Sequence, residues 1–184
     1  MKDTRMKILL TILGCFVVAV AGGFAFIYSG VYDVSASTPD NALVAWAVHV
    51  VSDHSVGARL GVIKVPAGLD QPQQIAAGGH LFAQNCAVCH GGPGLKETPI
   101  AHGMNPPPPD LYRAGRVPAS DENFQFIKYG VKMTGMPEFG DTHTDEQIWS
   151  LVAFLGQAPG LKAPAFATET GMDATIAVPA KTGG

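Results

Sequence analysis

The chain has 184 residues and a formal net charge of −3 at pH 7, a balance too mild to indicate a nucleic-acid-binding protein. Charged residues make up 15% of the sequence, against about 25% in a typical soluble domain, and the excess of apolar residues is concentrated at the N-terminus. This length accommodates one domain and an additional segment, since single domains usually have ~100–200 residues.

The first predicted element is an apolar helix from Ile8 to Tyr28. These 21 residues contain no charged side chain, and as a helix they would be ~31 Å long, which matches the ~30 Å hydrocarbon core of a bilayer. Three basic residues precede the run, and the next basic residue is Arg59. The positive-inside rule therefore predicts a cytoplasmic N-terminus, a membrane anchor within residues 1–28 and an exported remainder.

A cleaved signal peptide is the alternative interpretation of this segment. Ser35, Ala36 and Ser37 supply the small residues of a cleavage site, but the apolar run is longer than the ~7–15 residues usual in signal peptides. Cleavage would leave a soluble periplasmic protein. Cys15 lies inside the apolar run and is interpreted as an ordinary small apolar residue.

Residues 29–70 are predicted to form a linker that contains one short helix. Asp40 or Asn41 would cap this helix, and it would end at about Ser52, with valine and alanine residues at helical spacing. The helix would either pack on the domain that follows or lie near the bilayer surface. Its role stays open at this point.

A second helix is predicted from Pro72, a residue favoured in the first turn of helices, to about Cys86. It leads into Cys86-Ala87-Val88-Cys89-His90, and two cysteines at this spacing followed by a histidine are the attachment pattern of a c-type haem. The two thiols form thioether bonds with the vinyl groups, and the histidine is the proximal ligand of the iron. Zinc would need further ligands, and the one remaining cysteine lies far upstream. The motif predicts one covalently bound haem c.

Two more helices are predicted before the C-terminus. Ser120 would be the N-cap of the first, which carries acidic residues in its first turn and ends at Gly130. Thr144 and Gln147 form a capping box that opens the second. Residues 158–184 are rich in Ala, Pro, Thr and Gly without sustained periodicity, and they are predicted to be a flexible tail.

The pattern from Gln71 to about Gln157 resembles the class I cytochromes c. Besides the haem motif, the resemblance rests on Gly78 and Phe82 in the preceding helix, because in that family the first helix crosses the last one closely. It implies an all-α cytochrome c fold, a few helices around one haem, here preceded by a transmembrane helix. The expected divisions of the chain are 1–28 for the anchor, 29–70 for the linker, 71–157 for the haem domain and 158–184 for the tail.

The same resemblance implies a role for the proline-rich stretch from Asn105 to Leu111. It places a Pro-x-Leu motif at Pro109 and Leu111, in which the proline carbonyl accepts a hydrogen bond from Nδ1 of the proximal His90. Such a bond fixes the imidazole ring and raises its basicity as a ligand. A rigid loop without this role is the alternative.

The segment from Val131 to Gly140 resembles the loop that supplies the sixth iron ligand in the family. Met136 precedes a proline and follows a glycine turn, so Met136 is the expected ligand opposite His90, and a thioether sulfur there raises the reduction potential. The alternatives are two other thioethers and two imidazoles, namely Met133, Met104, His102 and His143.

Iron bound by both His90 and Met136 has no open position, which favours electron transfer over catalysis. We therefore expect a single-pass, membrane-tethered monohaem cytochrome c, not an enzyme, in the bacterial inner membrane with its haem domain in the periplasm. It would relay single electrons between respiratory redox partners such as a cytochrome complex, an oxidase or a dehydrogenase. The alternatives are a haem c subunit of a larger oxidase or dehydrogenase complex, and a haem enzyme or sensor with a labile sixth ligand.

Overall fold

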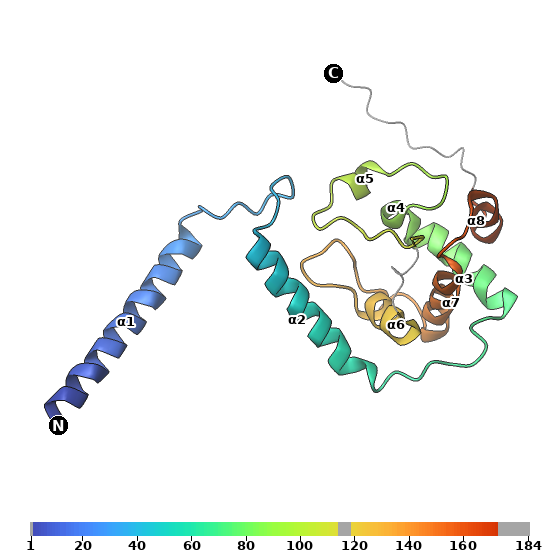
Figure 1. Ribbon diagram of the computed structural model, residues 1–184. Helices are drawn as coiled ribbons and strands as arrows, with labels where there is room; N and C mark the ends of the chain where they lie inside the picture. The colour runs from blue at the N-terminus through green and yellow to red at the C-terminus, as the bar shows by residue number, and fades with distance from the viewer. Residues whose placement is uncertain (1, 114–118, 173–184) are drawn as a thin grey trace, which may run out of the picture. The chain divides into compact units, whose positions relative to one another are not determined.

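The computed structural model describes residues 2–113 and 119–172, and all regular secondary structure within these ranges is helical. This confirms the all-α fold class. The chain divides into two compact units, the first ending at Thr38 and the second beginning at Pro39. Figure 1 labels the eight helices of the described residues in chain order.

The first unit contains the helix α1 (Lys2–Tyr28). The helix begins at Lys2, before the apolar run. Asp3 lies in its first turn, where a negative charge interacts favourably with the helix dipole. Its apolar side chains are exposed. Among the described residues, α1 is the one helix long and apolar enough to cross a membrane.

The core of the second unit is formed by α3 (Pro72–Asn85) and α7 (Asp145–Gln157). The two helices pack closely at Gly78, where a Cβ atom would lie 1.9 Å from the carbonyl oxygen of Ser150. The rings of Phe82 and Phe154 meet beside this contact with their centroids 5.2 Å apart. Gly78 and Phe82 therefore have the packing roles that the resemblance implies.

The helix α6 (Ser120–Tyr129) packs on α7 through the stacked rings of Phe124 and Trp149. Ser120 is not its N-cap, contrary to the sequence prediction. Ala119 occupies that position, and no side chain caps the helix, since Ser120 already has a helical backbone. The helix ends at Gly130, whose φ of 61° suits glycine, and the capping box of Thr144 and Gln147 is present at the start of α7.

The linker helix α2 (Ala42–Leu60) continues well past Ser52, where the sequence analysis ends it. Asn41 caps its N-terminus by accepting a hydrogen bond from the backbone N–H of Leu43. The polar residues after Ser52 remain exposed on the helix and do not end it, and Arg59 donates to the carbonyl of Ser55 in the last turn. The helix contacts α6.

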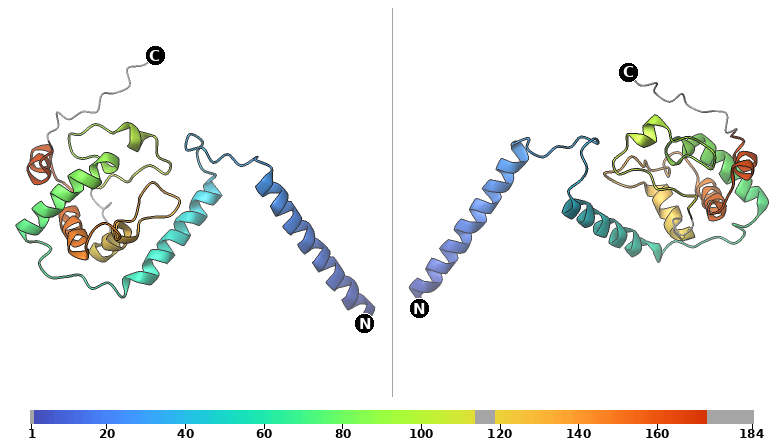
Figure 2. Two further views of the ribbon diagram at one scale, coloured as in Figure 1. Left: turned by 180° about the vertical axis from the view of Figure 1, so that it is seen from behind. Right: turned by 45° about the horizontal axis from the view of Figure 1, so that its top comes forward.

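The prediction of a flexible tail from residue 158 is wrong for the helix α8 (Ala163–Thr170), which contacts α3 (Figure 2). Phe166 is 1% exposed and packs on the rings of Phe82 and Tyr112. Gly79 gives the helix room, since a Cβ atom there would clash with the carbonyl oxygen of Glu169. One buried aromatic residue leaves no periodic pattern in the sequence. Residues 173–184 of the predicted tail lie outside the described residues.

Candidate haem-binding site

The haem motif forms a single helical turn directly after α3. Cys86 ends α3 and precedes the short helix α4 (Ala87–His90). Its carbonyl oxygen accepts hydrogen bonds from the backbone N–H groups of both Cys89 and His90, at 3.0 and 2.9 Å. The turn therefore brings the two predicted attachment cysteines and the predicted proximal ligand together on one short piece of backbone.

Both thiols of the motif are free and half-buried. Burial, together with the smaller effect of the nearby Cys89, raises the pKa of Cys86 to about 12. The Cys86 thiol is therefore protonated at neutral pH. Two free thiols on one turn suit two thioether bonds to a single prosthetic group.

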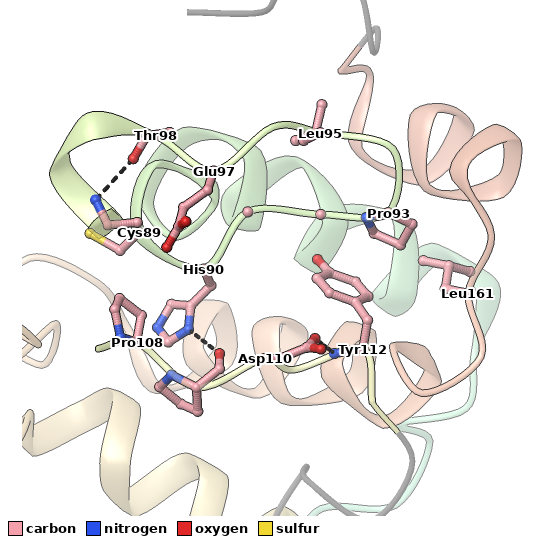
Figure 3. A pocket seen from close by; sticks show the side chains of 14 residues that line it. Cys89, His90, Pro93, Leu95, Glu97, Thr98, Pro108, Asp110, Tyr112 and Leu161 are labelled. Carbon is pink, nitrogen blue, oxygen red and sulfur yellow. Dashed lines mark hydrogen bonds between the residues drawn. The ribbon is translucent and has the colours of Figure 1, made fainter. Parts of the chain in front are cut away.

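The ring of His90 is held by the proline-rich loop. Its Nδ1 lies 3.1 Å from the carbonyl oxygen of Pro109, the contact drawn in Figure 3. Burial lowers the pKa of His90, and the hydrogen bond to Pro109 opposes that shift in part. The imidazole is neutral at pH 7, and a proton on Nδ1 donated to Pro109 leaves the Nε2 lone pair to coordinate a metal.

A cavity of about 530 Å³ opens beside His90. Its walls come from α4, the loop after it, the proline-rich loop and Leu161 near α8 (Figure 3). Tyr112 lines the cavity, and its hydroxyl is buried without a hydrogen-bond partner. A covalently attached haem fits these groups, namely the neutral imidazole, the two free thiols and the hydroxyl without a partner. Met136 does not line the cavity.

The helix α5 (Pro99–His102) contacts α4, and Leu111 anchors the end of the proline-rich loop. Leu111 is buried in the main core cluster. The Thr98 hydroxyl donates to the carbonyl of Val88, at 2.5 Å, and accepts a hydrogen bond from Ala101. Sequence analysis missed α5 and Thr98, although a threonine followed by proline is a common start of a helix. Tyr112 was also missed, and no sequence pattern indicates it.

The loop from Val131 to Met136 is closed by its own hydrogen bonds. The backbone N–H of Met136 donates to the Thr134 hydroxyl, and the Met136 carbonyl accepts from Val131. The Met136 side chain is half-buried against the core, whereas Met133 has a φ of 61° and is 82% exposed.

The remaining candidate ligands lie in different surroundings. Met104 packs on the same loop, because its sulfur lies 3.1 Å from where a Cβ atom of Gly135 would be. His102 is exposed, with Nδ1 3.8 Å from a carboxylate oxygen of Glu97. His143 packs edge-on against the ring of Phe139. Of the three candidate thioethers, Met136 and Met104 both pack at this loop, whereas Met133 is exposed.

Residues 73–155 match the family model described as cytochrome C oxidase, cbb3-type, subunit III. The matched segment begins in α3 and ends in α7, so both α2 and α8 lie outside it. No curated protein and no solved structure matches the chain.

Proposed function

Given that residues 73–155 form a c-type cytochrome domain with covalently bound haem c, we propose that the chain is a membrane-tethered periplasmic cytochrome. It relays single electrons between respiratory redox partners. The observation that carries the proposal is the single turn that presents Cys86, Cys89 and His90 together, with the His90 ring held by Pro109.

In this proposal each site residue has a distinct task. Cys86 and Cys89 would hold the haem through thioether bonds, and His90 would coordinate its iron. The Pro109 carbonyl fixes the tautomer and orientation of the imidazole and increases its basicity. Leu111, which is buried in the core, would help to exclude water from the end of the proline-rich loop.

Met136 is proposed as the sixth ligand. The Met136 side chain is half-buried whereas that of Met133 is exposed, and this difference supports the choice of Met136. The bound haem supplies a one-electron couple, and a thioether ligand raises its potential. The ligand loop is fixed by Thr134 and by the glycine at position 130, where a Cβ atom would clash with Glu138 and Pro137. A rigid loop would hold the Met136 sulfur at the iron, which suits electron transfer better than substrate binding.

The helix α1 is proposed as an uncleaved single-pass anchor of the inner membrane. Its length and composition support a membrane span, and the basic residues before it favour a cytoplasmic N-terminus. The haem domain would then be in the periplasm.

A second candidate function is that of a subunit in a larger oxidase or dehydrogenase. The match to a model described as an oxidase subunit favours it. Extraction of the full chain in a mild detergent distinguishes the two functions. A single haem-stained polypeptide supports the independent carrier, and co-purification of further subunits in fixed ratio supports the complex.

Spectroscopy of the purified full-length protein tests the electron-transfer proposal. We expect a haem band that follows the polypeptide through denaturing electrophoresis, a low-spin reduced spectrum and a ferric sulfur-to-iron charge-transfer band. Carbon monoxide should not bind readily. A colourless polypeptide would refute haem attachment, and a missing charge-transfer band together with rapid carbon monoxide binding would favour an enzyme or sensor.

A further inference from the structure

The N-terminal half of α2 exposes a row of large apolar side chains. No residue of this helix is buried, and Leu43, Trp46 and Val51 are 69, 62 and 68% exposed. Val44 and Val48 are exposed beside them. We call these five residues the α2 apolar surface. Contiguous exposed apolar side chains on one element indicate an interaction site.

Charge is absent from this part of α2. From Ala42 to Ser52 the sequence has no acidic or basic residue apart from His49. Asp53 and Arg59 both lie in the second half of the helix. The α2 apolar surface therefore has no charge pattern with which to select a charged protein partner, whereas an uncharged surface containing a tryptophan suits the interfacial zone of a bilayer.

The contact of α2 with the rest of the second unit does not cover the α2 apolar surface. The helix contacts α6, and Ala47 and Val50 are half-buried while the five side chains of the α2 apolar surface are exposed. Packing within the unit thus leaves these five side chains without cover.

The chain itself links this surface to a membrane. Only residues 29–41 separate α1 from α2, and 13 residues span at most ~45 Å when fully extended. Val31 and Val34 in this linker are also exposed apolar residues. A short tether gives a linked binding site an effective concentration in the mM range, so even weak lipid affinity keeps α2 at the bilayer.

We propose that the N-terminal half of α2 lies in the headgroup region of the same bilayer that α1 spans, with Trp46 in the interfacial zone. The inference rests on the proposed membrane anchor. The occupant is a lipid surface that need not be anionic, because this half of α2 offers no lysine or arginine. Docking through α2 would limit the orientations that the attached haem domain takes above the membrane.

Fluorescence of the full chain in lipid nanodiscs tests the proposal. Discs of zwitterionic phosphatidylcholine are compared with discs whose acyl chains carry bromine, which quenches only tryptophan near the acyl region. The chain has two tryptophans, and the emission difference between the wild type and Trp46→Phe isolates Trp46 without altering Trp149, which stacks on Phe124. We expect the brominated discs to lose most of the Trp46 emission, and a Leu43→Glu, Val51→Asp variant to restore it.

The outcomes separate this inference from the proposed anchor. If haem absorbance elutes with the discs but Trp46 emission is the same in both lipids, the anchor stands and α2 does not lie on the bilayer. If Trp46 is shielded from iodide yet insensitive to bromine, a protein covers the surface, and the lipid proposal is overturned. If haem absorbance elutes without discs, the anchor fails and this inference fails with it.

Discussion

His90 is fixed at two points that belong to different parts of the chain. Its backbone belongs to the turn that Cys86 starts, and its ring is oriented by the carbonyl of Pro109. Because the acceptor is a main-chain atom, replacing the Pro109 side chain does not remove it. The orientation of the His90 ring, the proposed iron ligand, thus depends on the path of the proline-rich loop, and the successive prolines make that path rigid.

At the residue scale, the clearest prediction concerns which methionine side chain binds the iron. We expect Met136→Ala to abolish the ferric sulfur-to-iron charge-transfer band and to lower the potential by on the order of 0.1 V, within the ~0.8 V that axial ligands span. Met133→Ala should change neither, because Met133 is exposed. Optical spectroscopy and redox titration measure both effects. Loss of the band in Met104→Ala, with Met136→Ala unaffected, would transfer the ligand role to Met104.

At the scale of elements, the crossing of α3 and α7 depends on a missing side chain. We expect Gly78→Ala to destabilise the domain by ~1–3 kcal/mol or more, because the new Cβ atom would meet the Ser150 carbonyl at 1.9 Å. Gly156→Ala, in the same α7, has open space around it and should stabilise the domain by up to ~1 kcal/mol. Denaturant unfolding followed by circular dichroism gives both values. Equal effects of the two substitutions would show that the close crossing is unimportant.

The helix α8 is expected to be part of the folded haem domain, although it lies beyond the segment that matches the family model. Phe166 is buried among Phe82 and Tyr112, and its ring lies against Gly92 in the loop after the haem motif. Phe166→Ala should therefore cost about 3–5 kcal/mol of unfolding free energy, and the exposed Thr168→Ala should cost little. If Phe166→Ala left the unfolding free energy unchanged, α8 would not be part of the folded domain.

The elements that sequence analysis predicted correctly are those with strong local signals. α3 and α7 have apolar residues at helical spacing and clear N-terminal signals in Pro72 and in Thr144 with Gln147. The haem motif is a local sequence pattern, so it can be recognised without knowledge of the fold. α8 was missed because tertiary contacts, above all those of the buried Phe166, stabilise it, and such contacts leave no local pattern in the sequence. The Tyr112 hydroxyl and the packing of Met104 on Gly135 depend on distant parts of the chain, so local sequence patterns do not indicate them.

On the scale of the whole molecule, the charge asymmetry around α1 favours one orientation of the proposed anchor. Lys2, Arg5 and Lys7 precede the apolar run, and no basic residue follows it until Arg59. The side matters for the chemistry, since the resemblance to c-type cytochromes implies that haem is attached in the periplasm. An inverted anchor would leave Cys86 and Cys89 where that attachment does not occur.

Reporter fusions test this topology directly. Alkaline phosphatase fused after Thr38, at the end of the first unit, should be active, because its disulfides form in the oxidising periplasm and not in the cytosol. The same enzyme fused after Lys7, before the apolar run, should be inactive. Exchanging the three basic residues for glutamate should reduce the activity of the Thr38 fusion by weakening the orientation signal. An inactive Thr38 fusion together with an active Lys7 fusion would contradict the proposed orientation.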